Sequence, residues 1–140
     1  GEYVIPFGQA RTVITGTDIT VVAMSRMVMF AEAAARQLAS DGISVEVIDP
    51  RTLSPLDDEA ILASVAKTGR LVVVDEANPI CSMASEIAAL VVEHGFDCLD
   101  APIRRVTAPH TPVPATPCLE AHYVPDTSAI VTAVRATLDY

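Results

Sequence analysis

Basic residues are scarce in this sequence: nine lysines and arginines stand against eighteen acidic side chains, and the formal net charge is −9. Such a surface repels phosphate backbones and anionic lipids. No apolar run approaches the roughly 20 residues of a membrane-spanning helix, and the first residues lack the basic-then-apolar pattern of a signal peptide. The sequence therefore predicts neither a nucleic-acid nor a membrane partner, and it favours the cytoplasm or an organelle interior.

Cysteine is also scarce, with Cys81, Cys98 and Cys118 far apart in the chain. Their spacing forms neither a C-x-x-C redox pair nor a set of zinc ligands. Free cysteine is among the more buried residue types, so we expect three reduced thiols packed in the interior.

The motifs of several catalytic and nucleotide-binding classes are missing. None of the six glycines forms a G-x-G-x-x-G or G-x-x-x-x-G-K-[ST] phosphate cradle. The first predicted strand ends Ala23-Met24-Ser25, without the acidic pair of a phospho-receiver domain. Ser25 has no G-x-S-x-G elbow and is interpreted as a helix N-cap. The three histidines are scattered, so the sequence predicts no catalytic residue and no metal ligand.

Short aliphatic runs that alternate with amphipathic stretches are the clearest positive signal. They predict a mainly parallel sheet covered by helices on both faces. The expected strands span residues 19–24, 43–48, 71–74 and 103–106, and the expected helices span 27–38, 57–67, 83–94 and 127–138. Gly42, Gly69 and Gly95 are interpreted as helix stops. At 140 residues the chain fits one α/β domain.

Proline is concentrated late in the chain, where six of the ten prolines lie between Pro102 and Pro125. Proline fixes φ and removes a hydrogen-bond donor, so this segment is neither a central strand nor a long helix. We expect an extended connection across the surface of the domain or of a partner.

Asp75 and Glu76 follow a predicted strand at the sheet edge where ligands of open α/β folds usually gather. They are the best internal candidates for a polar site, although adjacent residues point to opposite faces of a strand. A turn or cap pair explains them equally simply, and the same holds for Asp49. The residues by themselves thus predict an α/β domain without a visible active site.

Four strings resemble a known family. Residues 47–57 read V-I-D-P-R-T-L-S-P-L-D, similar to the D-x-R-T-L-x-P-x-D stretch of transketolase-type C-terminal domains. Residues 68–77 (T-G-R-L-V-V-V-D-E-A), 100–107 (D-A-P-I-R-R-V-T) and 112–114 (P-V-P) resemble segments of the β subunits of thiamin diphosphate-dependent 2-oxo acid and acetoin dehydrogenases. The resemblance covers nearly the whole chain in order.

This resemblance implies a three-layer α/β/α sandwich with a mixed, mainly parallel five-stranded sheet. Its short first strand, near residues 10–13, would run antiparallel. Residues 1–10 would be a linker remnant and residues 11–140 the transketolase C-terminal-like domain. Thiamin diphosphate and magnesium would be bound in the intact enzyme by other domains that carry a G-D-G motif, and this domain alone would be inactive.

The resemblance also suggests a substrate and partners. Many 2-oxo acid relatives carry histidine where this chain has Asp75, which favours acetoin over pyruvate or branched-chain substrates. Expected partners are an α subunit, a second β subunit and the basic subunit-binding domain of a dihydrolipoyl acyltransferase, which Asp100 and the terminal residue Tyr140 would contact. The chain alone is expected to form a homodimer. The expected subunit-interface residues are Pro109, Pro112, Pro114 and Pro117.

Two other readings stay open at this point. The chain could instead be the corresponding domain of transketolase or of deoxyxylulose phosphate synthase, which has the same fold. It could also be a free-standing acidic α/β module that binds a small ligand or a basic protein.

Overall fold

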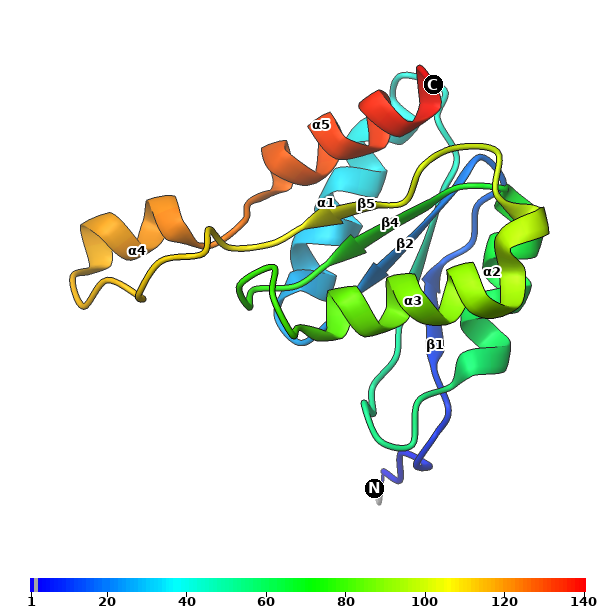
Figure 1. Ribbon diagram of the computed structural model, residues 1–140, viewed down its shortest axis with the longest axis horizontal. Helices are drawn as coiled ribbons and strands as arrows, with labels where there is room; N and C mark the ends of the chain where they lie inside the picture. Colours follow the sequence, from blue (N-terminus) through cyan, green and yellow to red (C-terminus); the bar gives the residue numbers. More distant parts are fainter. Residues whose placement is uncertain (2) are drawn as a thin grey trace.

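A five-stranded sheet runs through the centre of the computed structural model, which describes residues 1 and 3–140 (Figure 1). The strands are β1 (Arg11–Ile14), β2 (Ile19–Ala23), β3 (Val45–Asp49), β4 (Leu71–Val74) and β5 (Arg104–Val106). The helices are α1 (Met27–Ala39), α2 (Asp58–Thr68), α3 (Met83–Gly95), η1 (Phe96–Cys98), α4 (Pro117–Tyr123) and α5 (Thr127–Leu138).

The strand order is β1-β3-β2-β4-β5. β1 pairs with β3 in the antiparallel sense, and the other three pairings are parallel. This confirms the mixed, mainly parallel sheet expected from the sequence. The central strands β3, β2 and β4 are mainly apolar because both of their faces are covered, and all four residues of β4 are fully buried.

The two faces of the sheet carry separate hydrophobic cores. One core joins α1 and α5 to the sheet through residues such as Met27, Leu38 and Ile130. The other joins α2 and α3 through residues such as Ile61 and Ile87. Figure 1 shows α1 and α5 on one side of the sheet and α2 and α3 on the other. The chain is therefore a three-layer α/β/α sandwich, as expected.

Local signals explain the ends of the helices. The side chain of Asp57 accepts a hydrogen bond from the Ala60 amide at 3.1 Å, which caps α2. Gly69 ends α2 with φ of 69°, and Gly42 follows α1 with φ of 80°. α3 runs as far as Gly95 and then tightens into η1. These three glycines lie at helix ends as predicted.

Two local predictions were wrong. Ser25 is not the N-cap of α1: Arg26 occupies that position without a side-chain hydrogen bond, and Ser25 has φ of 54°. The chain turns sharply from β2 into α1, with the Met27 amide bonded to the Met24 carbonyl at 3.0 Å, so Ser25 serves the turn and not the cap. The second wrong prediction is that the three cysteines pack in the interior.

All three cysteines are exposed free thiols. Cys81 lies in the loop after β4, Cys98 in η1 and Cys118 in α4. None of them belongs to a strand or to an inward helix face, which is why their apolar character does not place them in a core.

A buried polar network links α2 to the sheet. Glu46 in β3 is only 4% exposed and accepts hydrogen bonds from Ser64 Oγ at 2.6 Å, from the Gly16 amide at 3.3 Å and from Lys67 Nζ. Burial by itself would raise the pKa of Glu46, but the three donors outweigh it and the pKa lies below its usual value. Glu46 is therefore a buried carboxylate whose charge is compensated.

Candidate functional site

The carboxyl edge of the sheet is occupied by turns. Asp75 is 8% exposed, and its Oδ1 accepts the Ala77 amide at 3.0 Å. Glu76 forms an ion pair with Arg26 at 3.2 Å. Asp49 accepts the Arg51 amide at 2.9 Å. Asp49 and Asp75 thus bond within their own loops, in agreement with the turn interpretation, whereas Glu76 pairs with the turn between β2 and α1.

The described residues present no preformed cluster of metal ligands. No group of three His, Cys, Asp or Glu side chains within residues 1 and 3–140 is arranged to hold a metal ion. The carboxylates of Asp49, Asp75 and Glu76, which follow strands, are already bonded to protein groups. In the same described part of the chain, no helix is long and apolar enough to cross a bilayer.

Asp100 and Tyr140 are 40 positions apart in the sequence but line the same groove, which has a volume of about 480 Å³. The groove lies where the end of α3, η1 and the segment before β5 meet the end of the chain. Its other lining residues are Ala88, Val92, Phe96, Leu99, Ala101, Pro102 and Ile103. We call it the Asp100 groove.

The Asp100 groove combines an apolar floor with an acidic rim. Phe96 is 66% exposed and Tyr140 is 79% exposed, so two aromatic rings are available to a partner. The side chain of Asp100 is 67% exposed and lies 4.0 Å from Arg70 Nη1, a distance at which an exposed pair is weak. The carboxylate thus keeps its capacity to bind a second cation.

The backbone holds Asp100 at this position. Its amide donates to the Gly69 carbonyl at 2.7 Å. The positive φ favours glycine at position 69, and a Cβ atom there would overlap the exposed Asp100 carboxylate and displace it. The sequence singled out Gly69 only as a helix stop.

Arg104 and Arg105 are close to Asp100 in sequence and could have neutralised it. They bind elsewhere: Arg104 Nη2 donates to the Ala136 carbonyl at 3.2 Å, and Arg105 Nη1 donates to the Pro79 carbonyl at 2.7 Å. Successive residues of β5 point to opposite faces of the sheet, which separates the two guanidinium groups from the turn at Asp100.

The Pro-rich segment does not lie across its own domain, which was the first of the two placements expected. Residues 109–123 form an arm that projects from the body and carries the short helix α4 at its tip (Figure 1). No residue of α4 is buried, and Val113 and Leu119 are 68% and 57% exposed. Pro117 sits in the first turn of α4, where its missing N–H costs nothing.

The four prolines expected at a subunit interface all lie on this arm. Pro109, Pro112 and Pro117 are exposed and Pro114 is partly buried. Buried residues at Ala108 and Pro125 fix the two ends of the arm to the domain. The arm therefore offers apolar surface that its own domain leaves uncovered.

Residues 8–130 match the family described as the transketolase C-terminal domain, and the chain belongs to that family. It is 55% identical to the β subunit of acetoin:2,6-dichlorophenolindophenol oxidoreductase of Bacillus subtilis, over 97% of this chain and 40% of that protein. It is 45% identical to the pyruvate dehydrogenase E1 component subunit β of Leifsonia xyli, over 99% of this chain and 41% of that protein. The chain thus spans about two fifths of the length of these relatives.

The fold has a close counterpart among solved structures. A split-gene transketolase, described as an inactive β4 tetramer, superposes with a TM-score of 0.86 over 96% of this chain and 44% of that chain, at 28% identity. The resemblance seen in the sequence strings is thereby confirmed at the level of family and fold.

Proposed function

We propose that this chain is the C-terminal domain of the β subunit of a thiamin diphosphate-dependent dehydrogenase that works in the cytoplasm. The intact enzyme would cleave acetoin or decarboxylate a 2-oxo acid and pass the acyl group to lipoamide. Identity is higher to the acetoin enzyme (55%) than to the pyruvate enzyme (45%), and Asp75 agrees with the acetoin pattern. Within this scheme, residues 1–10 are a linker remnant and residues 11–140 are the domain.

The role of this domain in the proposed enzyme is assembly. Thiamin diphosphate and magnesium would be bound by other domains of the intact protein, and the lack of a cluster of three metal ligands among the described residues supports this assignment. Proposed partners are an α subunit and a second β subunit. Both relatives are named as β subunits, which supports a multi-subunit protein.

The exposed arm is the proposed subunit interface. Val113 and Leu119 would lose contact with water when a neighbouring subunit covers the arm, with Pro109, Pro112 and Pro117 beside them. Prolines lower the entropy that an exposed segment loses on binding, because φ is already restricted. We therefore expect the chain alone to form a homodimer through this arm.

A second contact surface is the Asp100 groove, which we propose binds the basic subunit-binding domain of a dihydrolipoyl acyltransferase. The observation that carries this proposal is that Asp100 and Tyr140 line one groove although they are far apart in sequence. A net charge of −9 attracts a basic partner over roughly a Debye length of 8–10 Å. Asp100 would then bind an arginine of the partner through charge-assisted hydrogen bonds, while Phe96 and Tyr140 contact apolar parts of the partner domain.

The test is surface plasmon resonance with the acyltransferase subunit-binding domain and the 140-residue chain, whose two cores lie entirely within its own sequence. We expect Asp100→Lys to weaken binding at least about tenfold, which corresponds to about 1.4 kcal/mol. The control is Asp97→Lys, which changes the charge equally in exposed η1 outside the groove lining.

Wild-type affinity should also fall as salt rises. Equal affinities of wild type and Asp100→Lys, without salt dependence, would remove Asp100 from the interface. Equal weakening by Asp97→Lys would show that only net charge matters. Saturable binding of a small ligand with no affinity for the acyltransferase domain would instead favour a free-standing binding module.

A further inference from the structure

The outer edge of β5 is open. β5 is the last strand of the sheet and pairs only with β4. The Val106 carbonyl accepts the Asp75 amide at 3.0 Å, so the backbone groups of Val106 face inward along the sheet. Because these groups alternate along a strand, the N–H and C=O of Arg105 and Thr107 face the outer edge. An open edge of this kind can pair with another extended chain.

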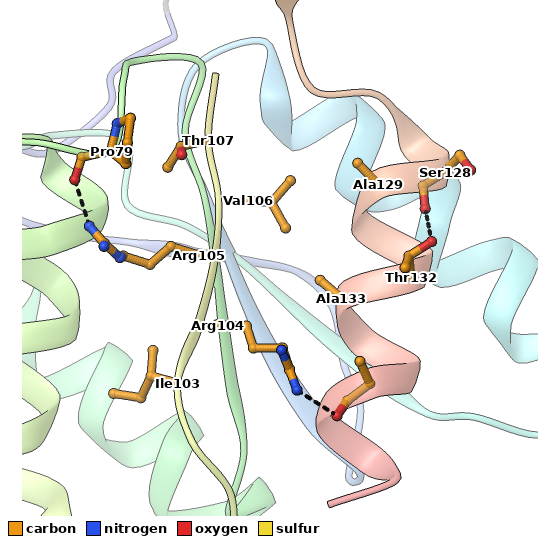
Figure 2. Close-up of a pocket in the computed structure, with 11 residues that line it drawn as sticks. Pro79, Ile103, Arg104, Arg105, Val106, Thr107, Ser128, Ala129, Thr132 and Ala133 are labelled. Atoms are coloured by element: carbon orange, nitrogen blue, oxygen red, sulfur yellow. Dashed lines mark hydrogen bonds between the residues drawn. The ribbon is translucent and has the colours of Figure 1, made fainter. Parts of the chain in front are cut away.

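A groove follows this edge. It has a volume of about 720 Å³ and is lined by β5 and α5, with Pro79 on the side of β5 away from α5 (Figure 2). The wall contributed by α5 is built from small side chains, namely Ser128, Ala129, Thr132, Ala133 and Ala136. Small residues on the helix leave room beside β5 for a further strand.

Two cations flank the open edge. Arg104 bonds to the Ala136 carbonyl at 3.2 Å on the side of α5, and Arg105 bonds to Pro79 and to Ser85 Oγ, at 2.5 Å, on the side of α3. All of these acceptors are neutral. The ion pairs found among the described residues involve other arginines, so neither guanidinium is paired with a carboxylate there.

Among the described residues no carboxylate lines this groove, although the chain has twice as many acidic as basic side chains. A guanidinium has five N–H donors, and the bonds described use only a part of them. Arg104 and Arg105 thus remain able to bind carboxylates from outside the domain. Both are exposed, and their present bonds hold them on either side of the strand.

We propose that the outer edge of β5 binds an extended acidic segment of a partner protein as a sixth strand. The backbone of the segment pairs with Arg105 and Thr107, and its acidic side chains bond to Arg104 on one face and Arg105 on the other. This inference rests on the edge and its charges and is independent of the Asp100 groove.

A second copy of this chain fits the edge less well. Antiparallel pairing of β5 with β5 would bring the Arg104 and Arg105 side chains of two copies together, and like charges on neighbouring strands are destabilising. Charge complementarity therefore selects an acidic strand.

The probe is a short fluorescein-labelled peptide that alternates glutamate with threonine, measured by fluorescence anisotropy with the 140-residue chain. We expect saturable binding that weakens as salt rises. Arg105→Glu should weaken it at least about tenfold, or about 1.4 kcal/mol. Arg11→Glu is the matched control because Arg11 is an exposed arginine on β1, at the opposite edge of the same sheet. It should change the affinity by less than about twofold.

Two further peptides test the mode of binding on the wild-type chain, so the proposal does not depend on the folding of a variant. The same peptide with every amide N-methylated keeps its charge but cannot donate to the strand edge, and we expect it not to bind. A peptide with lysine in place of glutamate should not bind at this edge, so Arg105→Glu should not weaken any affinity that it has for the acidic chain.

Three results would overturn the proposal: no saturable binding of the acidic peptide, equal binding of the N-methylated peptide, or equal weakening by Arg11→Glu. Sedimentation that shows a dimer disrupted by Arg105→Glu would overturn it in favour of a second copy at this edge.

Discussion

Replacing Glu46 by glutamine tests how a charge buried at the 4% exposure level is stabilised between α2 and the sheet. The side chain of Glu46 is 5% exposed and accepts bonds from Ser64, the Gly16 amide and Lys67. Glutamine has nearly the same shape but only one acceptor oxygen. It can keep the bond from Ser64, in which case its NH₂ group faces the Gly16 amide, and two donors then oppose each other.

The expected loss of stability in Glu46→Gln follows from the hydrogen bonds that each partner of Glu46 loses. A hydrogen bond to a charged group contributes about 1.5–3 kcal/mol, and a buried donor left unsatisfied costs about 1–3 kcal/mol. Gly16 is buried and bears that cost in full. Lys67 is 42% exposed, so water takes over its solvation and the lost ion pair adds little. We expect Glu46→Gln to lower the free energy of unfolding by about 2 kcal/mol at neutral pH.

The difference in stability between wild type and Glu46→Gln should decrease as the pH falls. The pKa of Glu46 is lowered in the folded state, so the unfolded chain binds a proton there more readily. The stability that Glu46 contributes is complete above the unfolded value of about 4.3 and is lost as the pH falls through the lower folded value. The gap between wild type and Glu46→Gln should therefore narrow below about pH 5.

Urea unfolding followed by circular dichroism at a series of pH values measures both quantities. Glu93→Gln, which removes one negative charge from the exposed face of α3, should stay within about 0.5 kcal/mol of wild type. A Glu46→Gln variant as stable as Glu93→Gln at neutral pH, or a gap that widens as the pH falls, would refute the account of the network.

Three further outcomes follow from the structure. Gly69→Ala and Gly42→Ala should each lower the free energy of unfolding, measured in thermal melts, by about 1–2 kcal/mol because both glycines have positive φ. Only Gly69→Ala, whose Cβ displaces the Asp100 carboxylate, should also weaken binding of the acyltransferase domain. The 140-residue chain should show no saturable binding of thiamin diphosphate with magnesium tighter than about 10 μM, or about 7 kcal/mol, in isothermal titration. Val113→Asp should weaken the expected homodimer at least about tenfold in sedimentation, or about 1.4 kcal/mol. The control Met29→Asp, at an exposed apolar site on α1, should leave the dimer unchanged. A wild-type chain that stays monomeric at high concentration would contradict the interface.

The fold was largely predictable because its signals are local. Each buried strand is a short aliphatic run, and Gly42 and Gly69 take the left-handed conformation that their positions after helices predict. The antiparallel β1 came only from the family resemblance, since four residues with a half-exposed pattern carry little periodicity. Ser25 was misassigned because its residue type suits a cap, whereas its place in a tight strand-to-helix turn decides its conformation.

The sequence by itself determined the alternation of elements, the acidic charge and the family strings, all of which depend on residue type and short spacing. Only the tertiary structure decided that Asp100 meets Tyr140 in a groove, that Glu46 finds donors from α2 and from Gly16, and that the Pro-rich arm projects outward. It also decided that Arg104 and Arg105 flank an open edge without carboxylates. The physical reason is that these features join residues distant in sequence, whose proximity is set by how the helices pack on the twisted sheet and not by the preferences of any one segment.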